Sequence, residues 1–81
     1  VYTLHARKKF SDLKFFGIIV TEAQILRTIS NPKYNIKDNG KQISALTFDE
    51  GHNLRVVHKK DKDDIIVITF YVYRKGRYGE Y

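Results

Sequence analysis

The sequence predicts an α+β domain in which two N-terminal helices pack on one face of a small antiparallel sheet. Two observations lead to this fold class. Apolar residues recur at helical spacing in the first part of the chain, and the remainder alternates apolar and polar residues between turn signals. At 81 residues with 42% apolar content, the chain has the size and composition of a single folded domain spanning residues 1–81.

The first segment, Val1 to Leu4, is rich in β-forming residues and is expected to be a short strand. A helix should follow it, because Ala6, Phe10 and Leu13 fall on one helical face. Gly17 is expected to stop this helix, since glycine readily adopts the left-handed conformation found at helix ends.

A second helix has clear signals at both ends. Thr21 and Gln24 have the spacing of a capping box, in which each side chain bonds the other residue's backbone N–H. The helix should end at Asn31-Pro32, because a residue before proline avoids helical dihedral angles. Its predicted apolar stripe is Ile25, Leu26 and Ile29.

The second half of the chain reads as strands. Asp38-Asn39-Gly40 is a strong hairpin turn signal. The segment Ile65–Tyr73 is apolar on both faces, which predicts a place in the middle of the sheet. The predicted strands of this meander are Tyr34–Lys37, Gln42–Phe48, Leu54–Lys59 and Ile65–Tyr73.

Alternation along the strands separates two faces. The apolar face should consist of Leu54, Val56, Ile66, Ile68 and Phe70, packed on Phe10, Leu13, Ile25 and Ile29. No helix remains to cover the other face, so it is expected to be open. It would carry Arg55, Thr69, Tyr71 and Tyr73, with Arg74 and Arg77 at its edge.

A surface of arginines and tyrosines suits RNA, because guanidinium groups hold phosphates and aromatic rings stack on bases. The alternative is that the tyrosines are present as good strand formers and the arginines are simply solvated. The basic, aromatic tail Tyr73–Tyr81 has the same two interpretations, a ligand-binding segment or a frayed end.

Charge and composition limit the function classes. Fifteen Lys and Arg against nine Asp and Glu give a net charge of +6, which favours polyanionic partners, nucleic acid first and an acidic protein second. The absence of cysteine excludes disulfides, thiolate zinc sites and cysteine catalysis. No apolar run approaches the length of a membrane helix and no signal peptide is visible, so we expect no membrane partner and a cytoplasmic location.

Three histidines, His5, His52 and His58, are the groups that titrate near neutral pH. None has metal-ligand spacing with another, so no metal and no other cofactor is expected. Taken alone, each favours a surface or structural role over catalysis. Lys59 and Lys60 are expected to lower the pKa of His58.

The order of these motifs resembles the RelE/ParE toxin superfamily, and most closely its BrnT-like small relatives of unknown function. The resemblance lies in His5-Ala6-Arg7 at the first helix, Ile19-Val20-Thr21-Glu22 opening the second, and Asn53–Val57 before a charged turn. Ile65–Thr69 and the basic, aromatic end complete it, so it covers nearly the whole chain. The family fold that it implies is a small sheet with two N-terminal helices on one face.

RelE-like members cleave messenger RNA, commonly on the ribosome, whereas ParE-like members poison DNA gyrase. The resemblance therefore implies RNA, including ribosome-bound mRNA, and a cognate antitoxin as partners; a homodimer is also left open. When the family's motifs are compared with this sequence, His5 and Arg7 match the family's opening pair of residues. Arg55 matches the family's strand arginine, and Thr69 matches the end of its last strand. The C-terminal segment is matched loosely by Arg74, Arg77 and Tyr78.

The leading hypothesis is a metal-independent endoribonuclease toxin in which the 2′-hydroxyl attacks the adjacent phosphate. Arg55 would be the most critical residue, unless it is paired with Glu50 or Asp64 to steady the hairpin. The alternatives are a non-catalytic binder of a protein such as gyrase, or a plain RNA- or DNA-binding module. The predicted catalytic residues are Arg55, His5, His58 and Tyr78, and the predicted RNA-binding residues are Arg7, Thr69, Tyr71, Arg74 and Arg77.

Overall fold

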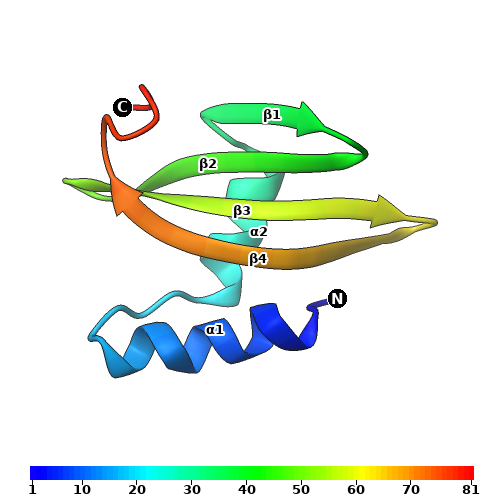
Figure 1. Cartoon of the computed structure of the whole chain (residues 1–81), viewed down its shortest axis with the longest axis horizontal. Helices are drawn as coiled ribbons and strands as arrows, with labels where there is room; N and C mark the ends of the chain where they lie inside the picture. Colours follow the sequence, from blue (N-terminus) through cyan, green and yellow to red (C-terminus); the bar gives the residue numbers. More distant parts are fainter.

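The computed structural model describes all residues, 1–81. Two helices, α1 (Leu4–Phe15) and α2 (Glu22–Ser30), precede a four-stranded antiparallel sheet (Figure 1). The predicted α+β fold is therefore confirmed. Neither helix has the length and apolar character needed to cross a membrane. The strands lie side by side in chain order: β1 (Tyr34–Asp38), β2 (Lys41–Asp49), β3 (His52–Asp61) and β4 (Asp64–Arg74).

Local signals set the helix ends. The capping box of α2 forms as predicted, with the Thr21 hydroxyl accepting from the Gln24 backbone N–H and the Gln24 side chain accepting from the Thr21 N–H. After α1 the chain turns at Gly17, which has a φ of 81°. The stripe of α2 differs in one residue: Ile25 is buried and Ile29 packs on the core, but Leu26 faces solvent.

The first hairpin turn also forms as expected. Asn39 and Gly40 both have positive φ, at 48° and 77°. Two positive φ angles at the centre of a two-residue loop give a type I′ turn, whose twist matches that of the flanking strands. This turn joins β1 to β2 in a regular antiparallel register.

The position of β4 was predicted wrongly. It is the last strand of the sheet rather than a central one. Its outer edge is nevertheless covered, because Tyr2 forms a parallel bridge with Val67 and α1 runs along the same strand (Figure 1). Residues 1–3 thus take the place of a further strand, which explains how an edge strand can be apolar on both faces.

The core lies between the helices and one sheet face, on which Leu54, Val56 and Phe70 are buried as predicted. Ile66 and Ile68 are not part of this core, and Val67 takes their place. The cause is a bulge: Val57 pairs with Thr69 and His58 with Val67, so one residue of β4 is unpaired. A bulge reverses the alternation of side chains beyond it. The helical residues Phe10, Leu13, Ile25 and Ile29 do contribute to the core as predicted.

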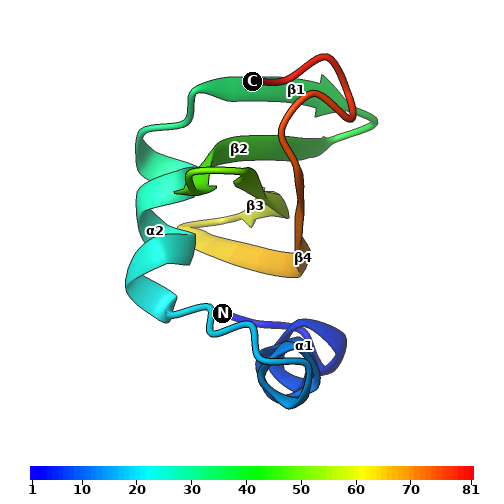
Figure 2. The same ribbon diagram turned by 90° about the vertical axis from the view of Figure 1, so that its left-hand side faces the viewer.

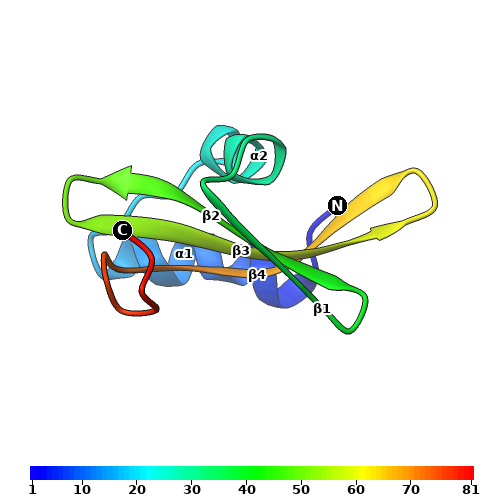
Figure 3. The same cartoon turned by 90° about the horizontal axis from the view of Figure 1, so that it is seen from above.

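Figures 2 and 3 show the layers that result. Helix α2 crosses one face of the sheet, and α1 lies beside β4 at one edge. The C-terminal segment that follows β4, residues 75–81, folds onto the side of the sheet opposite α2 (Figure 3). The face that the sequence predicted to be open is therefore partly covered by the chain itself.

Candidate functional site

The C-terminal segment covers Arg55, which strand alternation correctly places on the face away from the core. Arg55 on β3 is paired with Tyr71 on β4. The whole Arg55 residue is only 8% exposed to solvent. The expectation of an exposed arginine on an open face is therefore wrong. The reason is that residues 75–81 turn back over the sheet instead of fraying (Figure 3).

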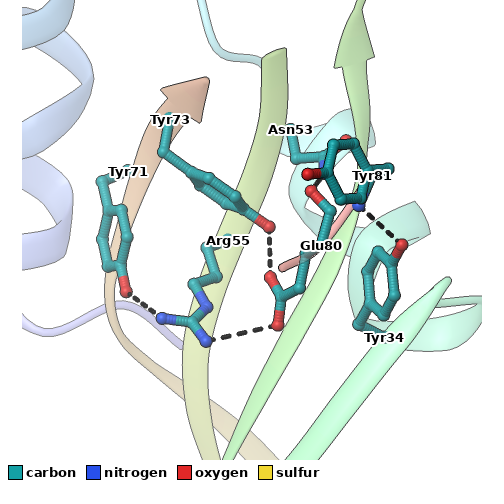
Figure 4. Close-up of polar contacts among 7 residues, drawn as sticks. All are labelled: Tyr34, Asn53, Arg55, Tyr71, Tyr73, Glu80 and Tyr81. Carbon is teal, nitrogen blue, oxygen red and sulfur yellow. Dashed lines mark hydrogen bonds and ion pairs between the residues drawn. The ribbon is translucent and has the colours of Figure 1, made fainter. Parts of the chain in front are cut away.

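Arg55 lies in a cluster of polar contacts that spans two strands and the C-terminal segment. Its Nη1 donates to the Tyr71 hydroxyl at 3.0 Å, and its Nη2 lies 3.3 Å from Glu80 Oε2. The Tyr73 hydroxyl donates to the other oxygen of Glu80 (Figure 4). The ion pair proposed from the sequence thus exists, but its acid is Glu80 and not Glu50 or Asp64.

The Tyr78 ring closes the cluster. The Arg55 guanidinium carbon lies 4.1 Å from the ring centroid, and that of Arg77 lies 5.6 Å from it. Both are within the range of cation–π attraction. Burial works to lower the pKa of Arg55, but the Tyr71 hydroxyl and the Glu80 charge outweigh it and raise that pKa, so the guanidinium stays charged.

The pKa of the Tyr73 hydroxyl provides a test of the packing in this cluster. Burial, and next the hydrogen bond to Glu80, raise the pKa of Tyr73 above its ordinary value of 10.0. A raised pKa means that the folded state favours the protonated phenol, so this stabilisation is complete below pH 10 and is lost as pH rises above it. We expect the ultraviolet difference titration between wild type and Tyr73→Phe to show one phenol ionising well above pH 10. A difference curve centred at or below pH 10 would contradict this packing.

A second group of polar residues lines a cleft at the end of β4, beside the turn that joins β2 to β3. This cleft has a volume of about 370 Å³ and includes Asp49, His52, Arg74 and Arg77. The two arginines were predicted from the sequence to bind RNA. Their juxtaposition with a histidine and a carboxylate was not predicted.

Asp49 and His52 form a hydrogen-bonded pair within the cleft. Asp49 Oδ1 lies 2.9 Å from His52 Nδ1 and also accepts the Gly51 N–H at 3.0 Å. The hydrogen bond from His52 lowers the pKa of Asp49, so this group is a carboxylate that can only accept. Nδ1 of His52 therefore carries the hydrogen, and Nε2 is left as the ring nitrogen that can take a proton.

The remaining cleft wall is largely apolar and is contributed by Ile18, Phe48, Val72 and Tyr73, so Tyr73 borders both the cleft and the Arg55 cluster. A cleft with an apolar side and a cationic side matches the two parts of a nucleotide. The base can lie against side chains such as Phe48, while the phosphate meets arginine guanidinium groups. An Asp–His pair at such a site supplies an oriented proton acceptor.

Four of the sequence-predicted site residues lie outside both groups. His5 and Thr69 meet each other, with Nε2 3.1 Å from the threonine hydroxyl. Arg7 is exposed on α1, with its guanidinium carbon 5.9 Å from the Tyr2 ring centroid. The fourth is His58.

His58 is buried, and its Nε2 lies 2.8 Å from the Ser44 hydroxyl. Burial, rather than the neighbouring lysines, lowers its pKa and keeps it neutral. At 4% exposure it has too little accessible surface to contact a large substrate in this structure. This is a correction to the predicted catalytic set.

Sequence reasoning missed two functional candidates, His52 and Asp49. The available signal was Asp49-Glu50-Gly51-His52, in which an aspartate bonds the backbone two residues on and so forms a tight turn. Such a turn brings the next side chain back to the same carboxylate. No group of three or more histidines and acidic residues suited to a metal ion is found in the structure.

No family model, no curated protein and no solved structure matches this chain.

Proposed function

We propose that this chain is a RelE/ParE-like toxin that binds RNA and cleaves it in the cytoplasm without a metal ion. One observation carries the proposal: the oriented Asp49–His52 pair shares a cleft with Arg74 and Arg77. The net charge of +6 supports a polyanionic substrate. A cognate antitoxin belongs to the proposal as the partner that the family resemblance implies.

In the proposed reaction, His52 Nε2 removes the proton from a 2′-hydroxyl, whose oxygen attacks the adjacent phosphorus. The bond to the 5′-oxygen breaks, that oxygen takes a proton from water, and the proton on His52 is released to solvent. The products are a 2′,3′-cyclic phosphate and a 5′-hydroxyl. Arg74 and Arg77 stabilise the charge that develops on the phosphate oxygens, and Asp49 holds the imidazole and stabilises its protonated form.

These assignments change the roles inferred from the sequence. The proposed proton-transfer group changes from His5, His58 or Tyr78 to His52. Arg55 is paired with Glu80 and its guanidinium lies over the Tyr78 ring, and neither Arg55 nor Tyr78 lines this cleft. Arg74 and Arg77 keep the phosphate-binding role that the sequence predicted.

RNA binding should depend on salt through these two arginines. Each phosphate contact to a single strand contributes about 0.7 to the slope of log K against log salt concentration. We expect Arg74→Ala to reduce that slope by about 0.7, measured by fluorescence anisotropy with a single-stranded oligoribonucleotide. Arg27→Ala removes the same charge from α2 and should leave the slope unchanged. Equal slopes for wild type and Arg74→Ala would contradict the assignment.

A second candidate function is a ParE-like binder of a protein target without catalysis. The observation that favours it is the pair Phe15 and Phe16, which are both largely exposed at the end of α1. Exposed aromatic residues next to one another are typical of protein-binding surfaces. The two functions differ in one result: growth arrest by the expressed protein is lost in His52→Ala under the first and retained under the second.

A further inference from the structure

We propose that Arg55, Tyr71 and Tyr73 form a second phosphate-binding site for RNA, which the C-terminal segment closes by placing the Glu80 carboxylate where a phosphate would bind. The proposal rests on the proposed function and adds a mode of regulation to it. In this proposal part of the RNA-binding surface is covered by Glu80 (Figure 4), and displacement of residues 75–81 exposes it.

The chemistry of the masked site is that of an oxyanion receptor. Arg55 Nη2 and the Tyr73 hydroxyl each address one oxygen of Glu80, and Tyr71 holds the guanidinium from the other side. Charge-assisted hydrogen bonds of this kind are made equally well to carboxylate and phosphate oxygens. Glu80 therefore substitutes for the charge of a phosphate and for part of its hydrogen-bonding capacity.

The carboxylate does not satisfy the site completely. Arg55 Nε is buried and has no hydrogen-bond partner. Buried donors without partners are costly and uncommon in native proteins. A carboxylate has two oxygens, both engaged by Tyr73 and Nη2, whereas a phosphodiester offers two non-bridging and two ester oxygens. The unpaired Nε thus indicates a receptor for a ligand with more acceptors than Glu80 provides.

Few hydrogen bonds attach residues 75–81 to the sheet, so this segment can be released without unfolding the domain. Beyond Lys75, whose N–H bonds the Gly51 carbonyl, its backbone hydrogen bonds join only residues within 74–80. Four side-chain hydrogen bonds hold it to the sheet, and three of them go to Glu80. The fourth joins the Tyr81 N–H to the Tyr34 hydroxyl. Release therefore breaks no strand pairing. It breaks three hydrogen bonds to Glu80 and removes the Tyr78 ring from Arg55 and Tyr73.

The segment is also built to move as a unit. Gly76 has a φ of 93°, and the Tyr81 ring packs against it so closely that an added Cβ would lie 2.9 Å from a ring carbon. The guanidinium carbons of Arg55 and of Arg77 in the cleft lie 4.1 Å and 5.6 Å from the Tyr78 ring centroid. Displacement of this ring would leave two neighbouring positive charges that an RNA strand can contact.

The test compares Glu80→Gln with Glu22→Gln. Both variants remove one negative charge, but Glu22 lies on α2 and makes no contact with Arg55. The ligand is a 2′-O-methylated oligouridine, which lacks the attacking hydroxyl and therefore reports binding without cleavage. Amide hydrogen exchange at Tyr81 without RNA measures release of the segment, because this N–H donates to the Tyr34 hydroxyl on β1.

We expect Glu80→Gln to exchange faster at the Tyr81 amide, which donates to the Tyr34 hydroxyl, and to bind the oligonucleotide at least about fivefold more tightly than Glu22→Gln. The gain should disappear in the double variant Arg55→Ala, Glu80→Gln. Equal affinity of the two single variants would overturn the proposal, and so would a gain that persists without Arg55.

The same measurements separate this proposal from the proposed function. Binding by wild type that requires Arg74, with no gain in Glu80→Gln, refutes the masked site alone. Absence of RNA binding by every variant refutes both. Tighter binding by Glu80→Gln in a protein that never cleaves RNA supports the masked site and refutes the ribonuclease.

Discussion

Phe70→Ala is expected to lower the free energy of unfolding by about 3–5 kcal/mol, the range for removal of a buried aromatic ring. Phe70 is 0% exposed, and its ring centroid lies 4.6 Å from that of Phe10 on α1. Its removal leaves a cavity that the surrounding helix and strands can fill only in part. For a domain of this size the loss is a large share of total stability.

Urea denaturation followed by circular dichroism measures this effect. Phe15→Ala is the matched control, because Phe15 is 85% exposed and its truncation should change stability by no more than about 0.5 kcal/mol. A loss below about 1 kcal/mol for Phe70→Ala would show that the two sheet faces are assigned the wrong way round, and the location of the Arg55 cluster with them.

His52→Ala should reduce the rate of RNA cleavage by at least about 100-fold, the lower end for removal of a general base. The loss should appear in the rate of the chemical step rather than in RNA affinity, which we propose that Arg74 and Arg77 provide. Single-turnover cleavage of a labelled oligoribonucleotide separates the two quantities. Asp49→Asn should have a smaller effect, because it weakens the orientation of the imidazole but leaves Nε2 in place.

His5→Ala is the control for this experiment. His5 is also an exposed histidine with a hydrogen-bonded side-chain partner, Thr69, but it does not line the cleft. Its removal should leave the cleavage rate within about twofold of wild type. A larger loss in His5→Ala than in His52→Ala would return the catalytic role to the residue that the family resemblance implied.

Features of the fold that depend on neighbours in the chain could be predicted from the sequence. The Thr21–Gln24 capping box, the turn at Asn39-Gly40 and the alternation through Leu54 and Val56 each follow from local chemistry. Alternation failed at Ile68, because a bulge is decided by how two strands pair and leaves no local signal in the sequence. The same limit explains why the covered edge of β4 was mistaken for a central position.

Parts of the candidate site could also be predicted from the sequence, whereas other parts could not. Arg74 and Arg77 could be predicted from charge and strand position, and Asp49–His52 could have been found from a four-residue turn. The cover over Arg55 could not, since its acid, Glu80, lies 25 residues away and no periodicity relates the two. Glu50 and Asp64 were nearer in sequence, but the hairpin geometry does not bring them to the guanidinium.

The central claim is that the cleft cleaves RNA without a metal ion, and one measurement tests it most directly. Purified protein is incubated with end-labelled single-stranded RNA in the presence of EDTA, with and without ribosomes, and the products are identified by mass spectrometry. We predict fragments ending in a 2′,3′-cyclic phosphate, produced by wild type and not by His52→Ala. Intact RNA in both conditions, or equal cleavage by wild type and His52→Ala, would contradict the account.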